Sequence, residues 1–190
     1  GLCVRQFVAK ENPHGMMAMA MTLLGLMYVP WLLNFIQKIE FFRFPAGADA
    51  RAGTFYVLYF IVVTKFSDVG AYVTGSLIGK HKMIPRISPG KTWEGFAGAV
   101  VISTGASVAF AQLAGTRLYG MSLTHAVVLG VILSIAAVIG DLIESLFKRE
   151  AGVKDSGGYF PGIGGILDLL DSLLFNAPLM YVYLRHVLTH

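Results

Sequence analysis

The sequence predicts an all-α, polytopic membrane protein with about five membrane-spanning helices. Of its 190 residues, 55% are hydrophobic and only 14% are charged, and its mean hydropathy is +0.66. A soluble domain carries charge on about a quarter of its residues, so this composition indicates a bilayer as the solvent. The apolar residues form stretches of about 20 residues without the alternation typical of strands. Because a backbone in lipid must satisfy its own hydrogen bonds, these stretches are expected to be helices.

Five apolar stretches account for the predicted helices in chain order. The first is rich in methionine and leucine, and the second is apolar except for Lys65 and Asp68. The third and fourth are rich in glycine, and small residues allow membrane helices to approach one another closely. The fifth begins directly after a glycine-rich run. The predicted bounds are about Met16–Ile36, Gly53–Ile78, Gly95–Gly115, Leu123–Phe147 and Ile166–Leu188.

The loops between these helices are short, and the most basic are residues 79–94 and 148–155. Two predicted crossings separate them, so both lie on one side of the membrane, which the positive-inside rule makes the cytoplasmic side. The linker 37–52 then lies on the opposite side. We expect an integral membrane protein with its site on the cytoplasmic side, in the inner membrane if the source is bacterial. Cations confined to short loops favour anionic lipid and substrates over nucleic acid as partners.

Acidic residues occur where lipid is expected. Five of the eleven lie inside or at the edge of apolar stretches, namely Asp68, Asp141, Glu144, Asp168 and Asp171. A carboxylate at membrane depth is costly unless it faces a polar cavity or a cation. Asp141 with Glu144, and Asp168 with Asp171, are three residues apart and share a helix face. Oxygen ligands without His or Cys suit Mg²⁺, which we expect as the cofactor.

Structural ion pairs are the alternative explanation for these acids, with Lys65, Lys148 or Arg149 as partners. Other metal chemistry has little support in the sequence. Cys3 is the single cysteine, which excludes an intrachain disulfide and disfavours a cysteine metal site. The five histidines have no metal-ligand spacing, so we expect them to be structural or exposed to solvent.

A glycine-rich segment joins the fourth and fifth predicted helices. Five glycines surround Pro161 and lead directly into a helix N-terminus. Bare backbone N–H groups and the positive end of a helix dipole favour anions, and Lys148, Arg149 and Lys154 add positive charge. Phosphate-binding donors, cations and carboxylates that suit Mg²⁺ are together the equipment of phosphoryl or nucleotidyl transfer.

The loop before the third predicted helix is a second cationic segment. Lys80, Lys82, Arg86 and Lys91 lie within twelve residues of one another. This density suits a triphosphate or a lipid phosphate, and the alternative is a solvated loop that contacts anionic headgroups. Residues 88–92 are expected to form a turn, with Thr92 as the N-cap of the following helix.

The chain resembles the phosphatidate cytidylyltransferase (CDP-diacylglycerol synthase) family in two ordered blocks. The run from Asp68 to Gly95 is similar to one shared block of that family. The second block begins at Gly140-Asp141 and ends at Asp171. The residues that carry this second resemblance are Ser145, Lys148, Arg149, Lys154, Asp155, Pro161, Gly162, Gly164, Gly165, Asp168 and Asp171.

Two positions depart from the family pattern. Ile163 stands where the family usually has His, and Leu169 where it usually has Arg. Ile163 neither donates a hydrogen bond nor moves a proton, so we expect the backbone glycines and the aspartates to carry the site. A basic loop is expected to supply the phosphate contact that the missing Arg would make.

The resemblance implies that the chain transfers the CMP moiety of CTP to phosphatidic acid, giving CDP-diacylglycerol and pyrophosphate. It implies Mg²⁺, with a monovalent cation as a candidate second ion. The expected metal ligands are Asp141, Asp168, Asp171 and Asp68, and the expected catalytic residues are Asp141, Asp168, Asp171 and Lys148. The expected substrate-binding residues are Lys91, Arg149, Lys154, Asp155, Gly164, Gly165 and Ser145.

The resemblance also bears on the extent of the protein. We expect residues 1–190 to form a single membrane-embedded catalytic domain. The family has more N-terminal helices, and this chain begins at Gly1 instead of Met, so preceding helices are expected to be missing. The helices rich in small residues are compatible with a homodimer.

Two other functions fit parts of the pattern. A CTP-dependent polyprenol or phytol kinase shares the membrane setting and the nucleotide, but it releases CDP in place of pyrophosphate. A transporter with an intramembrane carboxylate site explains buried acids and interrupted helices. It does not explain the cations and glycines beside them.

Overall fold

The computed structural model describes residues 15–150 and 166–189. Most of these residues are helical, which confirms the predicted all-α class. Each predicted apolar stretch coincides with a helix to within a few residues. In chain order the elements are α2 (Gly15–Glu40), α3 (Ala52–Ile78), β1 (Lys82–Ile84), β2 (Ser88–Thr92), α4 (Trp93–Ala114), the 3₁₀ turn η1 (Gly115–Arg117), α5 (Leu123–Glu150), α6 (Ile166–Tyr183) and the π-helical turn η2 (Leu184–Leu188).

Three helical segments in the described part of the chain are long and apolar enough to cross a membrane. They are Ala52–Ile78, Trp93–Arg117 and Leu123–Arg149. Helices α2 and α6 match the first and fifth predicted stretches, but they are not among these three segments. The prediction of about five spans is therefore supported for three helices.

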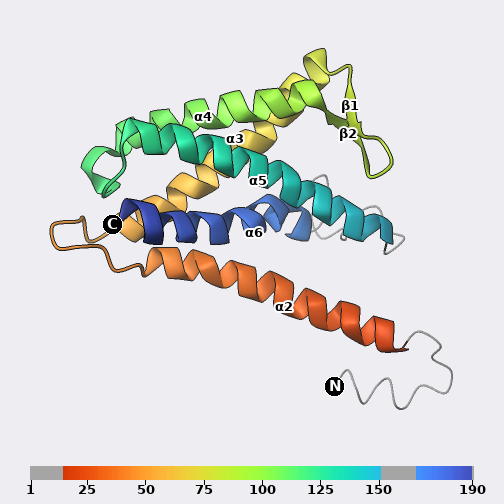
Figure 1. Ribbon diagram of the computed structural model, residues 1–190, viewed down its shortest axis with the longest axis horizontal. Coiled ribbons are helices and arrows are strands. Elements are labelled where there is room, and N and C mark those ends of the chain that lie inside the picture. The colour runs from red at the N-terminus through yellow and green to blue at the C-terminus, as the bar shows by residue number, and fades with distance from the viewer. Residues whose placement is uncertain (1–14, 151–165, 190) are drawn as a thin grey trace.

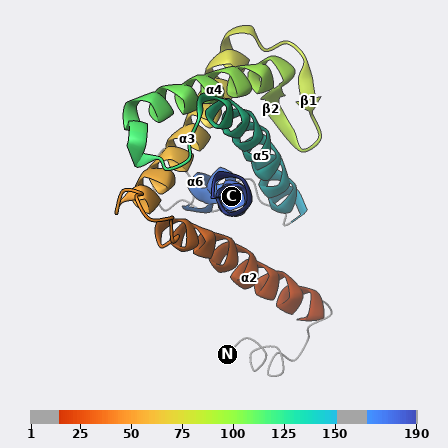
Figure 2. The ribbon, with the colours of Figure 1, turned by 60° about the vertical axis from the view of Figure 1, so that its left-hand side comes forward.

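The helices form a bundle in which α6 lies between α2 and the group formed by α3, α4 and α5 (Figures 1 and 2). The β1–β2 hairpin and the C-terminal end of α5 lie at one end of the bundle. The linker between α2 and α3 and the C-terminus lie at the opposite end (Figure 1). The bundle therefore presents two separate ends, each with its own group of polar residues.

Glycines allow the central helices to approach closely. A Cβ added at Gly70 would lie 2.8 Å from the Gly98 carbonyl oxygen, and one at Gly130 would lie 2.7 Å from the Thr104 Cα atom. These positions are on α3 and α5, and both face α4. Gly105 on α4 has open space around it instead. The packing interpretation of the glycines therefore holds at particular positions and not along whole helices.

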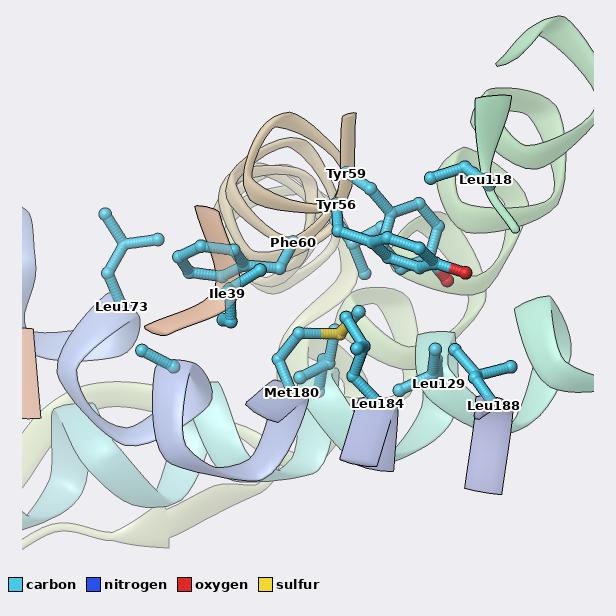
Figure 3. Packing of buried hydrophobic residues seen from close by; sticks show 13 residues of the cluster. Ile39, Tyr56, Tyr59, Phe60, Leu118, Leu129, Leu173, Met180, Leu184 and Leu188 are labelled. Atoms are coloured by element: carbon cyan, nitrogen blue, oxygen red, sulfur yellow. The ribbon is translucent and has the colours of Figure 1, made fainter. Parts of the chain in front are cut away.

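An aromatic and aliphatic core fills the end of the bundle next to the α2–α3 linker. Tyr56, Tyr59 and Phe60 of α3 are fully buried there against residues of α5, α6 and η2 (Figure 3). Buried polar side chains continue from this core toward the middle of the bundle. The Asn176 Nδ2 of α6 donates to Thr64 Oγ1 of α3 at 2.6 Å and to the Leu133 carbonyl of α5 at 3.0 Å. This amide connects three helices.

The hairpin is the element that the sequence did not predict. β1 and β2 pair antiparallel, with Lys82 opposite Thr92 and Ile84 opposite Ser88. The predicted turn at residues 88–92 is wrong, because these residues form strand β2. The predicted N-cap is confirmed, since the Gly95 amide donates to Thr92 Oγ1 at 3.1 Å.

Candidate active site

A cavity of about 640 Å³ opens at the hairpin end of the bundle. Its walls come from the C-terminal half of α3, the hairpin, the first turn of α4 and the C-terminal half of α5. The charged and hydroxyl side chains that line it are Lys65, Asp68, Tyr72, Ser88, Lys91, Thr92, Asp141 and Lys148. In a chain with so few charged residues, this gathering of charges marks the cavity as the candidate site.

Lys91 connects the hairpin to α5. Its Nζ lies 2.6 Å from Asp141 Oδ2 and donates to the Val138 carbonyl at 3.2 Å. The Lys91 side chain is only 18% exposed, whereas that of Asp141 is 40% exposed. The carboxylate therefore stays accessible from the cavity while its cationic partner is largely buried beside it.

Lys65, Asp68 and Ser172 form a second polar contact, between α3 and α6. Lys65 Nζ lies 3.2 Å from Asp68 Oδ2, and Ser172 Oγ donates to the same oxygen at 3.0 Å. Lys65 Nζ also donates to Ser172 Oγ at 3.4 Å. Ser172 is fully buried. This contact holds the first turns of α6 against the charged part of α3.

The third pair lies on α5 alone. Lys148 Nζ is 3.1 Å from Glu144 Oε1, one helical turn earlier. Glu144 is buried, and Lys148 lines the cavity. The ion-pair alternative is thus observed for Glu144 with Lys148 and for Asp68 with Lys65. A third acid, Asp141, pairs with Lys91 of the hairpin, which is not one of the cations named in that alternative.

The hairpin is held by specific contacts and is not a freely solvated loop. Glu94, in the first turn of α4, accepts from the backbone amides of Lys80 and His81 at 3.2 Å, and its Oε1 lies 2.6 Å from His81 Nδ1. On the other side, Arg149 Nε donates to the Ile87 carbonyl at 3.3 Å. These contacts fix the strand that carries Lys91 over the cavity.

The charges around the cavity are arranged in pairs of opposite sign. Each lysine faces a carboxylate, so the pairs neutralise one another where the surrounding protein has a low dielectric constant. A phosphate group entering the cavity competes for the same ammonium groups and accepts several strong hydrogen bonds. When the phosphate displaces a carboxylate from its lysine, the carboxylate oxygen atoms become available to bind a cation. The site is therefore suited to bind a polyanion together with a metal ion.

The donor atoms fit Mg²⁺ in kind. The described side chains that line the cavity offer carboxylate and hydroxyl oxygens and include no Cys or His. Among the side chains that the structure describes, which do not include those of Asp168 and Asp171, no group of three or more His, Cys, Asp or Glu residues is close enough to hold a metal ion. Asp68 and Asp141 supply two carboxylates, so a complete ligand set requires further groups.

The predicted site residues fall into four groups. Asp68, Lys91, Asp141 and Lys148 line the cavity, whereas Ser145 and Arg149 are not among the described residues that do so. Asp168 and Asp171 lie in the first turns of α6, the segment that Ser172 anchors to α3, and their side chains lie outside what the structure describes. The remaining predicted residues lie outside the described residues, and these are Lys154, Asp155, Gly164 and Gly165.

Lys65 and Ser172 are among the residues of the site that were not predicted as such. Lys65 had a visible signal, because a lysine inside an apolar stretch is as anomalous as the aspartate three residues later. Ser172 had no such signal in the sequence beyond its position next to Asp171, because serine is common in membrane helices. Its role as a contact between helices depends on α3 and α6 meeting, which no local pattern indicates.

Comparisons with known proteins cover most of the chain. The model of a family described as "Cytidylyltransferase family" matches residues 2–187. A "Phosphatidate cytidylyltransferase" of Staphylococcus haemolyticus (strain JCSC1435) is 38% identical over 177 residues, which are 93% of this chain and 63% of that protein. One of Staphylococcus aureus (strain COL) is 44% identical over 134 residues, 70% of this chain and 50% of that protein.

A third relative carries no functional name. The "Uncharacterized protein YnbB" of Escherichia coli (strain K12) is 34% identical over 166 residues, which are 87% of this chain and 51% of that protein. The chain thus spans about half to under two thirds of the length of these curated relatives.

Proposed function

Because the chain belongs to the cytidylyltransferase family, we propose that it transfers the CMP moiety of CTP to phosphatidic acid. The products are CDP-diacylglycerol and pyrophosphate. The observation that carries the proposal is the cavity lined by Lys65, Lys91 and Lys148 together with two aspartates. Relatives named phosphatidate cytidylyltransferase support the choice of substrates.

The reaction needs charge neutralisation more than it needs a base. A phosphate oxygen of phosphatidic acid attacks the α-phosphorus of CTP and forms a new P–O bond. The bond from that phosphorus to the oxygen bridging to the β-phosphate breaks, and pyrophosphate leaves with the electron pair. Because the nucleophile is already an anion, no proton has to be removed from it. The barrier lies in bringing two polyanions together in the correct orientation.

The lysines of the cavity are proposed to hold the phosphates. Lys91 comes from the hairpin and Lys148 from α5, so two elements supply cations to the same cavity. Lys65 adds a third cation on α3. Arg149, Lys154, Asp155, Ser145, Gly164 and Gly165 are proposed as further substrate contacts on the strength of the sequence resemblance.

Four aspartates are proposed as the ligands of Mg²⁺. Asp68 and Asp141 line the cavity, and Asp168 and Asp171 belong to the helix end that Ser172 joins to Asp68. A bound Mg²⁺ would neutralise the phosphate charge that develops as pyrophosphate leaves. A monovalent cation is the candidate for a second ion.

The whole chain is proposed to be a single membrane-embedded catalytic domain. The chain is an integral membrane protein, and α2 and α6 are proposed to span the bilayer with the three helices identified above. The hairpin end, with the cavity, is proposed to face the cytoplasm, because it carries the most basic loops. A homodimer is proposed from the small-residue faces of the helices.

The direct experiment combines the purified chain, CTP, phosphatidic acid and Mg²⁺ in detergent or lipid vesicles and analyses both products. Release of pyrophosphate with formation of CDP-diacylglycerol is expected. Release of CDP with a phosphorylated alcohol, when polyprenol or phytol is supplied, would identify a kinase. Absence of any nucleotide turnover in a folded preparation would contradict both enzymes and favour a transporter.

The metal assignment predicts that Asp168→Asn or Asp171→Asn abolishes turnover. Each change replaces a charged ligand by a neutral one without changing its size. The variants are expected to stay folded in the membrane, which gel-filtration elution and circular dichroism would check. Near-normal CTP-dependent activity in both variants would overturn the assignment.

A further inference from the structure

A second polar hollow lies at the end of the bundle opposite the candidate active site. It measures about 770 Å³ and is lined by the end of α2, the linker that follows it, and the end of α6 with η2. Its described lining contains three cations, Lys38, Arg43 and Arg185, and no acidic residue. The α2–α3 linker and the C-terminal end of α6 lie at this same end of the bundle (Figure 1).

The cations of this hollow are not neutralised within the described residues. The ion pairs between described residues involve none of these three side chains. The nearby acid Glu40 instead accepts a hydrogen bond from Thr54 Oγ1 at 2.7 Å. This differs from the active-site cavity, where each lysine faces a carboxylate. Three cations that converge without an acidic partner favour an anionic ligand.

Aromatic rings hold the hollow in shape. Lys38 Nζ lies 4.5 Å from the centre of the Phe35 ring and 5.8 Å from that of Tyr181. Tyr181 also contacts Phe35 and Phe42, with ring centres 5.6 and 6.1 Å apart. These contacts join α2, the linker and α6. Aromatic and basic side chains at helix ends are typical of the headgroup level of a bilayer.

An apolar hollow adjoins the cationic one along α2. It measures about 620 Å³, shares Gln37 with the cationic hollow, and is otherwise lined by Met27, Pro30, Trp31, Leu33 and Asn34. Met27 is 69% exposed and Trp31 is 60% exposed. From Met27 to Lys38 the helix rises roughly 16 Å, close to half of the ~30 Å hydrocarbon core. An apolar surface of one leaflet's depth therefore leads to the cations.

We propose that these two hollows form a binding site for one anionic phospholipid, whose headgroup phosphate contacts Lys38, Arg43 and Arg185 and whose acyl chain lies along α2. Charge complementarity selects the headgroup, and the adjoining apolar hollow selects a lipid over a free phosphate ion. The site lies at the far end of the bundle from the proposed catalytic cavity. The proposal rests on α2 and α6 lying in the bilayer and not on the proposed reaction.

Trp31 allows a direct test, because the chain has two tryptophans and Trp93→Phe leaves Trp31 alone. The Trp93→Phe chain is placed in vesicles containing equal mole fractions of phosphatidylglycerol and phosphatidylcholine, with only one of the two carrying brominated acyl chains. Bromine quenches tryptophan fluorescence on contact. Brominated phosphatidylglycerol is expected to quench Trp31 several-fold more than brominated phosphatidylcholine.

Removal of the cations should remove this preference. Each of Lys38→Gln, Arg43→Gln and Arg185→Gln is expected to bring the several-fold preference close to equal quenching, because one cation near a membrane surface contributes roughly 1 kcal/mol, about fivefold in affinity. The matched control is Arg51→Gln with Arg117→Gln, which removes two cations outside the hollow and should preserve the preference. A charge-retaining variant, Lys38→Arg with Arg43→Lys and Arg185→Lys, should preserve it as well.

Three results would overturn the proposal. Equal quenching by the two brominated lipids in the unaltered site would show no selection of an anionic headgroup. An equal loss of the preference in the control pair would show that the overall charge of the chain, and not the hollow, causes it. Loss of the preference on adding inorganic phosphate, at an ionic strength matched with chloride, would assign the hollow to a free anion.

Discussion

At the scale of single residues, the candidate site is a set of lysines held by acids. Lys91 is the most informative, because it belongs to the hairpin and pairs with Asp141 on α5 at 2.6 Å. It is also largely buried, so its ammonium group has few competing water contacts. In the proposed reaction this group is poised to exchange a carboxylate for a phosphate.

Lys91→Gln is expected to lower kcat/KM for CTP about 10- to 100-fold, because hydrogen bonds to charged groups contribute roughly 1.5–3 kcal/mol. Steady-state kinetics with phosphatidic acid held constant would measure this. Lys82→Gln is the matched control, since Lys82 lies on β1 of the same hairpin, is exposed, and does not line the cavity. Similar losses in both variants would argue against a specific phosphate contact by Lys91.

Ser172→Ala tests the contact between α3 and α6. Loss of the hydrogen bond to Asp68 is expected to destabilise the chain by about 1 kcal/mol and to raise the Mg²⁺ concentration needed for half-maximal activity. Thermal unfolding and Mg²⁺ titration of activity would measure the two effects. Ser134→Ala is the control, because the fully buried Ser134 hydroxyl donates to Val131 within its own helix. If both variants had the same Mg²⁺ dependence, Ser172 would be only structural.

At the scale of elements, the positions of the glycines decide how closely the helices pack. Gly130 on α5 faces the backbone of α4 at Thr104, and Gly105 on α4 faces open space. The same residue type therefore has a packing role at one position and none at the other. A membrane helix gains no hydrophobic driving force from its lipid surroundings, so close van der Waals contact contributes much of the association.

Gly130→Ala is expected to lower the stability of the chain by about 1–3 kcal/mol, because the new methyl group would overlap the α4 backbone. Gly105→Ala is expected to leave stability unchanged or to raise it slightly, since alanine is the better helix former. Melting temperatures in the same detergent would compare the two. Equal melting temperatures would contradict the proposed role of the α4–α5 contact.

At the scale of the whole molecule, the two ends of the bundle differ in how their cations are partnered. The hairpin end carries lysines that face carboxylates around a cavity, and the linker end carries three cations around a hollow whose described lining includes no acid. If the helices cross the bilayer as proposed, these ends lie on opposite membrane faces. The proposed catalytic cavity then lies at one membrane face, and the proposed lipid site lies at the other.

This arrangement predicts opposite labelling of two introduced cysteines. In a Cys3→Ser background, Lys82→Cys in the hairpin is expected to react with a membrane-impermeant maleimide from the cytoplasmic side only. Asp49→Cys in the α2–α3 linker should react from the other side only. Labelling of intact cells and of inverted vesicles would measure this, and reaction of both cysteines from one side would exclude the proposed topology.

The sequence alone determined the helices of this protein and the region of its site. Apolar stretches of membrane length predicted all five helices to within a few residues, because helix formation in lipid depends on local hydrophobicity and backbone hydrogen bonding. Charged residues inside these stretches indicated Asp68 and Asp141, because a charge at membrane depth requires a local explanation. Both aspartates line the cavity.

Only the tertiary structure decided which charges meet. Lys91 pairs with Asp141 fifty residues later, and Ser172 donates to Asp68 across 104 positions. The hairpin that carries Lys91 is likewise secured by Arg149, from the end of a distant helix. Such contacts depend on how the helices pack and in what register, which local patterns do not encode. The cationic hollow also depends on tertiary packing, because its cations come from α2, the linker and η2.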